Sequence, residues 1–210
     1  KWMIGTVNSF FIGFTSTFIA TTLGTMAALG LSRPHMPYKG LIMAILISPM
    51  IVPLIITAAG MFFFYARVNL VYTFTGVILA HVALATPFVV ITVTATLVGF
   101  DMNMVKASQS LGAKPMRTFF KVIMPLILPG IISGALFAFI TSFDEVVIVM
   151  FMASLDQLTI PKQMWAGIRQ EISPVILCMA TCLVALSIFL LTTVELLRRR
   201  SEKLRGIKAR

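Results

Sequence analysis

Two adjacent carboxylates, Asp144 and Glu145, interrupt the apolar stretch SFDEVVIVMF. A charged side chain inside a membrane span costs about 2.5–3.5 kcal/mol near the bilayer centre, so such residues normally face a bundle interior or a wet cavity. A carboxylate in a low-dielectric passage attracts an ammonium group, which indicates a cationic solute. The alternative is a structural role, in which the carboxylates lie near the outer mouth or pair with Lys162 or Arg169. The candidate pathway residues are Phe143, Asp144, Glu145 and Trp165.

Few other residues could do chemistry. His81 stands alone in the apolar run ILAHVALATPF and is predicted to hydrogen-bond a neighbouring helix. Cys178 and Cys182 lie four residues apart without a nearby His, Asp or Glu, so we expect them to pack between helices rather than to bind a metal. The chain has no G-x-x-x-x-G-K-[ST] nucleotide motif. We therefore predict no catalytic residue, metal or cofactor in this chain.

The composition places these residues in an all-α integral membrane protein. Hydrophobic residues make up 59% of the 210 residues and charged residues 11%, and the mean hydropathy is +0.99, whereas soluble domains have roughly 45–50% and about 25%. The apolar runs reach the roughly 20 residues that a helix needs to cross a bilayer. Five spans are predicted, over residues 7–31, 41–65, 75–99, 126–152 and 174–197. Gly130 and Gly134 form a G-x-x-x-G pattern that permits close helix contact.

The basic residues predict the orientation. Of the 17 Lys and Arg, all except Lys1, Arg67, Lys162 and Arg169 fall in segments 32–40, 100–125 and 198–210. The positive-inside rule therefore places these three segments, and the C-terminus, in the cytoplasm. The net charge of +10 is explained by topology without nucleic-acid binding. The basic tail 198–210 is expected to lie against anionic lipid headgroups. Five spans put Lys1 outside, so a sixth helix is expected to precede it.

The segment KASQSLGAKPMRTFFKVIMPLILPG, residues 106–130, is too polar to be a span. Asp101 or Asn103 can cap a short helix, and Gly112 can end it in the left-handed conformation. Pro115 suits the first turn of a second helix. The pattern predicts a helix–turn–helix on the cytoplasmic surface, either as a docking site for another protein or as an amphipathic linker.

This segment resembles the EAA loop of permease subunits of bacterial ABC importers, whose signature is E-A-A-x-x-x-G-x9-I-x-L-P. The signature positions fall on Lys106, Ala107, Ser108, Gly112, Val122, Met124 and Pro125. Ala107, Gly112 and Pro125 match, whereas Lys106 and Ser108 replace the Glu and the second Ala. Further along, SFDEVVIVMFM and TIPKQMWAGIRQEISPVI are similar to stretches of permeases for polyamines such as spermidine and putrescine.

The resemblance implies a type I importer permease with a MetI-like helical bundle in one domain, residues 1–210, of the bacterial inner membrane. The implied partners are two ATPase subunits, a second and different permease subunit, and a periplasmic binding protein. The segment 101–125 would be the coupling segment, contacting the ATPase through residues 103–124. The coupling residues would be Lys106, Ala107, Ser108, Leu111, Gly112, Ala113 and Pro115. ATP would be hydrolysed on a separate chain.

Alternatives remain for both the mechanism and the solute. An ion-driven secondary transporter or channel is the competing mechanism, and opines, other amines or organophosphonates are the competing solutes. In the segment 153–173, Pro161 can begin a short helix. That helix is expected to be a gate facing the binding protein or a plain connector. Pro174, preceded by Ser173 as a cap, is expected to begin the last span.

Overall fold

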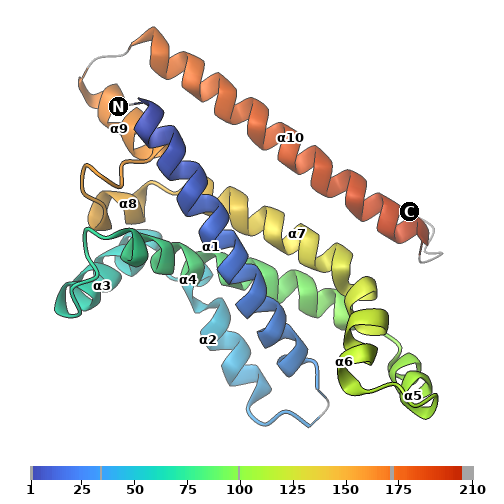
Figure 1. The fold of residues 1–210 in the computed structure, drawn as a ribbon. Helices are drawn as coiled ribbons and strands as arrows, with labels where there is room; N and C mark the ends of the chain where they lie inside the picture. Colours follow the sequence, from blue (N-terminus) through green and yellow to red (C-terminus); the bar gives the residue numbers. More distant parts are fainter. Residues whose placement is uncertain (1, 34, 99, 171–172, 205–210) are drawn as a thin grey trace.

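The computed structural model describes the backbone of residues 2–33, 35–98, 100–170 and 173–204, with the side chains of 102, 170, 194 and 197–204 outside the description. In this part of the chain all regular elements are helical (Figure 1). They are α1 (Trp2–Leu31), α2 (Lys39–Ile51), α3 (Leu54–Arg67), α4 (Phe74–Val98), α5 (Met102–Ser110), α6 (Pro115–Thr118), a π-helical turn η1 (Phe119–Ile123), α7 (Met124–Phe143), α8 (Val147–Met152), α9 (Ile160–Gln170) and α10 (Pro174–Leu204). The helical fold predicted from the sequence is confirmed.

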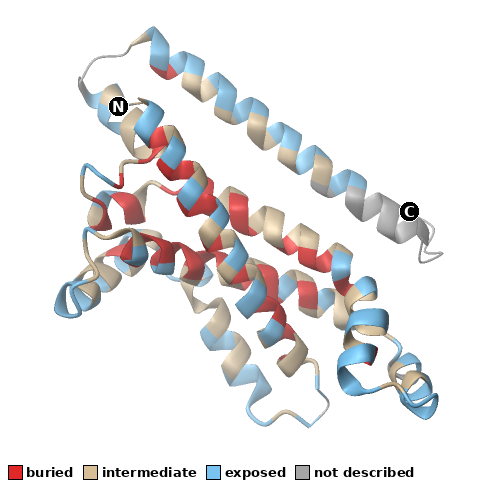
Figure 2. Ribbon diagram, in the orientation of Figure 1, coloured by how far each residue is buried: buried red, intermediate tan, exposed pale blue. Residues whose placement is uncertain are grey.

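The core lies where α1, α4 and α7 pack against one another (Figure 2). Along α1, every fourth residue from Ile12 to Ala28 is buried, namely Ile12, Ser16, Ala20, Gly24 and Ala28. Most of these side chains are small, so α4 can approach the α1 backbone closely. At Gly24 the approach needs glycine, because an added Cβ would lie 2.7 Å from Val89 Cβ.

The G-x-x-x-G pattern of α7 makes the predicted close contact. A Cβ on Gly134 would lie 2.5 Å from Thr92 Oγ1 and 3.0 Å from Val89 Cα, both in α4. A Cβ on Gly130 would overlap the hydroxyl of Thr96, one helical turn along α4. The two glycines therefore set the distance between α4 and α7.

Four helical stretches of the described chain are long and apolar enough to cross a membrane: Trp2–Leu31, Phe74–Val98, Pro115–Phe143 and Pro174–Thr193. The span predicted over 41–65 is not straight, because α2 and α3 meet at a bend of 104°. Pro53 has no N–H, and a residue before proline avoids the helical region. Val52 is accordingly extended, with φ −70° and ψ 134°. The pair is either one broken span or a re-entrant loop.

The span predicted over 126–152 is also interrupted. α7 ends at Phe143, residues 144–146 form a break, and α8 follows at Val147. The β-branched residues from Val146 to Val149 favour helix weakly. At the same place the Glu145 carboxylate accepts a backbone N–H that a continuous helix would bond internally. The predicted span is thus a long helix, α7, followed beyond the break by a short helix, α8.

α10 runs along one side of the bundle and contacts α7 and α9 (Figure 1). Most of its described residues are exposed or half-buried (Figure 2). Cys178 and Cys182 are both exposed, so the expected packing between helices of this chain is wrong: α10 packs on α7 and α9 through other faces. The predicted tail 198–210 lies outside the described residues, apart from the α10 backbone up to Leu204.

Candidate functional site

The coupling segment has the local structure that its sequence predicts. Asp101 caps α5, its Oδ1 accepting the Asn103 N–H at 2.9 Å. Gly112 takes the left-handed conformation, with φ +78°. Lys114 is extended, with ψ 154°, and Pro115 occupies the first turn of α6. α5 and α6 therefore form a helix–turn–helix at the end of the bundle where the α1–α2 connection also lies (Figure 1).

A side-chain contact braces this pair of helices. Ser108 Oγ in α5 lies 3.0 Å from Thr118 Oγ1 at the end of α6, and Thr118 is buried. Ser108 is a departure from the family signature, which has alanine at this position. The hydroxyl therefore gives this chain a link between α5 and α6 that alanine could not make, and Thr118 was not predicted from the sequence.

An open groove of about 550 Å³ runs along the helix–turn–helix. Its lining consists of Met104, Ala107, Ser108, Leu111, Gly112, Ala113, Arg117 and Val122. Leu111 is 88% exposed, so this face is apolar and uncovered in the isolated chain. The groove brings together five of the seven predicted coupling residues. Lys106 and Pro115 are exposed but do not line it.

The helix–turn–helix continues into α7 through the π-helical turn η1. Pro125 has no N–H to donate to the carbonyl of Lys121, which disturbs the regular helical ladder here. The chain nevertheless stays helical from Pro115 to Phe143. The groove and the end of α7 at Phe143 are therefore joined by one helical segment.

At the break beyond α7 the two carboxylates differ. Glu145 is only 7% exposed, and its Oε1 accepts the Ile148 N–H at 2.7 Å, so it caps α8. Asp144 is exposed, and its backbone N–H still bonds Ile140 O at 3.0 Å. Among the described residues no ion pair joins either carboxylate to Lys162 or Arg169. Of these two carboxylates, only that of Asp144 is therefore accessible from solvent.

The basic residues of α9 have other partners. Lys162 Nζ donates to Ala153 O at 2.7 Å and to Val149 O at 3.2 Å. The Arg169 guanidinium lies 5.7 Å from the centre of the Trp165 ring. Lys162, Trp165 and Arg169 line a hollow of about 280 Å³ with Met150 and Ala166. Partial burial lowers the pKa of the Lys162 ammonium below its ordinary value.

The connection before α9 is attached to α1 by polar contacts that the sequence analysis did not identify. Asn8 Nδ2 donates to Asp156 O at 2.7 Å and to Leu158 O at 3.0 Å. Ser9 Oγ accepts the Ile160 N–H at 2.9 Å, at the start of α9. The signal in the sequence was two adjacent polar residues in the apolar run GTVNSFFIG. α9 begins at Ile160, so Pro161 lies in its first turn as predicted, and α10 begins at Pro174 as predicted.

Two further predicted residues lie in the packed interior. Phe143 is 5% exposed. Its ring stacks on Phe139, with the ring centroids 5.2 Å apart, and lies tilted against Phe10 at 5.0 Å. It is part of the contact between α7 and α1. His81 is buried, and its Nδ1 lies 2.8 Å from Ser142 Oγ in α7. The predicted interhelical hydrogen bond of His81 is confirmed.

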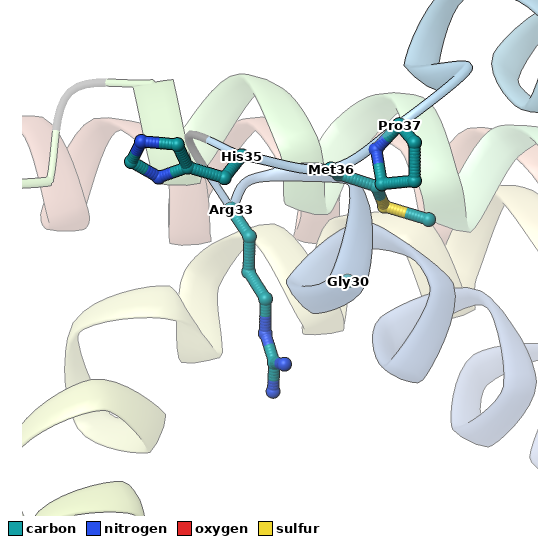
Figure 3. Close-up of a pocket in the computed structure, with 5 residues that line it drawn as sticks. All are labelled: Gly30, Arg33, His35, Met36 and Pro37. Carbon is teal, nitrogen blue, oxygen red and sulfur yellow. The ribbon is translucent and has the colours of Figure 1, made fainter.

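A third hollow, of about 540 Å³, lies at the α1–α2 connection and is lined by Gly30, Arg33, His35, Met36 and Pro37. The side chains of Arg33 and His35 point in different directions (Figure 3). They do not converge on one point, so the hollow lacks the arrangement of a polar ligand site.

Comparison with known proteins gives a family match over most of the chain. Residues 20–203 match the family described as binding-protein-dependent transport system inner membrane component. The spermidine/putrescine transport system permease protein PotC of Haemophilus influenzae is 29% identical over 195 residues, which cover 93% of this chain and 76% of that protein. The putrescine transport system permease protein PotI of Escherichia coli is 36% identical over 103 residues, covering 49% of this chain and 37% of PotI.

Solved structures share the arrangement of helices. A chain of the inward-facing MetNI methionine ABC transporter superposes with a TM-score of 0.66 at 20% identity, covering 99% of this chain and 96% of that one. A chain of an amino acid ABC transporter crystallised with histidines gives a TM-score of 0.68 at 17% identity, covering 95% of this chain and 93% of that one. At these identities the likeness concerns the fold alone.

Proposed function

The chain belongs to the family of binding-protein-dependent transport system inner membrane components, and on that premise we propose that it forms half of the pathway of an ATP-driven importer for a polyamine such as spermidine or putrescine. The observation that carries the solute class is the similarity to spermidine/putrescine permeases over 93% of the chain. The exposed carboxylate of Asp144 at the outer end of α7 supports a cationic solute. Opines, other amines and organophosphonates remain the competing solutes.

The proposed partners follow from the family. Two ATPase subunits would bind on the cytoplasmic side, a second and different permease subunit would complete the pathway, and a periplasmic binding protein would deliver the solute. The C-terminus would be cytoplasmic. The direction of α10 supports this arrangement, since it runs from the α9 end of the bundle toward the end that carries α5 and α6 (Figure 1).

We place the ATPase contact on the groove of α5 and α6. The Leu111 side chain is almost fully exposed there. Exposed apolar surface of this kind is typical of a protein–protein contact. The Ser108–Thr118 contact joins α5 to α6, so a movement of the ATPase that displaces one of these helices would displace both. Lys106 is exposed on α5, where the family has a carboxylate. Its ammonium would meet an acidic group on the ATPase.

The link from the groove to the solute runs through α7. The chain is helical from Pro115 to Phe143, and Asp144 follows directly. The 20 residues of α7 extend about 30 Å, the thickness of the hydrocarbon layer. ATP-driven movement of α5 and α6 would therefore displace the Asp144 carboxylate near the outer surface. The helix α9 (Ile160–Gln170), which includes Trp165, would contact the binding protein.

The solute class can be tested with the assembled importer in proteoliposomes that contain ATP. Uptake of radiolabelled spermidine and putrescine is compared with uptake of an opine and an organophosphonate, each delivered by the importer's own binding protein. We expect uptake of the polyamines alone. Uptake of an anionic solute at the higher rate would overturn the assignment of a polyamine while leaving the family membership intact.

A further inference from the structure

The short helix α8 is held at both ends by charged side chains of opposite sign. At its beginning, Glu145 Oε1 accepts the Ile148 N–H at 2.7 Å. At its end, Lys162 Nζ donates to Ala153 O at 2.7 Å and to Val149 O at 3.2 Å. A negative group at the N–H end and a positive group at the carbonyl end both match the unpaired backbone groups of a helix. A helix of six residues is unstable without such contacts.

The two charges come from different places in the fold. Glu145 belongs to the break beyond α7, next to Asp144, whereas Lys162 stands in the first turns of α9. The start of α9 is fixed in turn to α1, since Ser9 Oγ accepts the Ile160 N–H at 2.9 Å. A continuous set of contacts therefore leads from α1 through α9 and Lys162 to α8 and the carboxylates.

The charge of Lys162 can be removed while α8 keeps its other contacts. In the described part of the chain its ammonium has no carboxylate within ion-pair distance and is held by carbonyl oxygens. The end of α8 keeps another contact, because the Tyr72 N–H donates to Met152 O at 2.9 Å. The buried residues Ile148, Val149 and Met152 also keep their apolar contacts. Loss of the ammonium should loosen α8 rather than expel it.

We propose that Lys162 is a positioning residue for solute transfer: by fixing α8 it holds Glu145 in its capping contact and so sets the place of the Asp144 carboxylate. This inference rests on the proposed pathway role of Asp144. It also gives the outer helix α9 a defined influence on the solute site. If a partner on the outer side moved α9, the Lys162 ammonium would move α8 with it, and the position of the Asp144 carboxylate would change.

The test measures polyamine uptake and ATP hydrolysis on the same proteoliposomes, at saturating amounts of the loaded binding protein. Lys162→Met keeps the aliphatic stem and removes the charge, and Lys162→Arg restores a charge. Arg67→Met is the matched control: Arg67 is an exposed cation at the end of α3, and among the hydrogen bonds of the described residues none runs from it to an α8 carbonyl. We expect Lys162→Met to lower uptake about tenfold, the scale of a lost charged hydrogen bond, while ATP hydrolysis falls less than about twofold.

Lys162→Arg should recover most of the uptake, and Arg67→Met should behave as the unmodified protein. A general folding defect would instead lower uptake and ATP hydrolysis together, and this result would overturn the proposal. In a double-mutant cycle, Lys162→Met combined with Glu145→Gln should lose little more uptake than the worse single variant, because both act through α8. Fully multiplicative losses would contradict the inference.

The variant Asp144→Asn distinguishes a failure of the positioning role of Lys162 from a failure of the proposed pathway role of Asp144. If Asp144→Asn leaves uptake unchanged, the pathway role of Asp144 is wrong and the positioning role falls with it. If Asp144→Asn impairs uptake but Lys162→Met does not, only the positioning role of Lys162 is wrong.

Discussion

Asp144 and Glu145 are neighbours in the chain with different surroundings. Glu145 is buried and engaged with the backbone of α8, whereas Asp144 is exposed at the end of α7. The sequence indicated that two carboxylates in an apolar run need a wet or paired environment. It could not say which of the two would be exposed, because the difference depends on where the helix ends.

Asp144→Asn should reduce polyamine uptake by about an order of magnitude, because an amide attracts an ammonium group far less than a carboxylate does. Asp156→Asn is the matched control, since Asp156 is an exposed aspartate between α8 and α9 whose backbone carbonyl makes the contact with Asn8. Both proteins should reach the membrane in equal amounts. Equal uptake by the two variants would remove Asp144 from the pathway.

Gly112→Ala tests the turn of the coupling segment. Its φ of +78° costs a residue with a side chain about 1–2 kcal/mol, although a Cβ would meet nothing within 4 Å. We expect weaker co-purification of the ATPase and a lower ATP-dependent uptake, with little change in the stability of the bundle. Gly60→Ala, also in open space but inside α3, is the control and should change neither. Unchanged co-purification by Gly112→Ala would show that the turn geometry does not matter for docking.

At the scale of elements, local signals were reliable and long-range ones were not. The cap at Asp101, the left-handed Gly112 and the helix start at Pro115 depend on residues within one or two turns, and all three were predicted. The 104° angle between α2 and α3 and the break after Phe143 were not predicted. Pro53 and the Asp144–Glu145 pair stand at these two places, but a membrane span can contain proline or carboxylates and still be one continuous helix. Hydropathy shows that a segment is long enough to cross a membrane. It does not show where a side chain, such as the Glu145 carboxylate, accepts a backbone N–H in place of a helical carbonyl.

Contacts between distant segments were also beyond the sequence. Asn8 and Ser9 hold backbone groups about 150 positions further along the chain. Either residue alone is compatible with any helix in a membrane bundle. The identity of their partners follows only from the packing of α1 beside the start of α9.

Gly24→Ala tests the packing of α1 on α4. The added Cβ would lie 2.7 Å from Val89 Cβ, so the helices must separate, and we expect a loss of about 1–3 kcal/mol in the free energy of unfolding. Gly30→Ala in the same helix is the control, because its Cβ meets nothing within 4 Å. Thermal unfolding in detergent should show a lower midpoint for Gly24→Ala alone. A similar midpoint for both variants would mean that α1 and α4 can move apart without a loss of stability.

In the whole molecule, the proposed ATPase contact and the proposed solute site lie at opposite ends of the bundle. The groove of α5 and α6 lies at one end of the bundle, and the break, α8 and α9 lie toward the other (Figure 1). α7 connects them, and its two glycines hold it against α4. The exposed apolar surface of α10 suits lipid or a partner subunit (Figure 2). This arrangement fits a subunit that receives force on one side and handles solute on the other.

The central claim is that this chain moves a polyamine by using ATP hydrolysed on another subunit. The most direct measurement is radiolabelled spermidine uptake into proteoliposomes that contain the assembled importer, its binding protein and internal or external ATP as orientation requires, without any ion gradient. Uptake is predicted to require ATP and to disappear when the Walker lysine of the ATPase subunit is replaced by alanine. Normal uptake with the inactive ATPase would contradict the account. If that uptake then rose when an ion gradient was imposed in a second preparation, the result would support a secondary transporter.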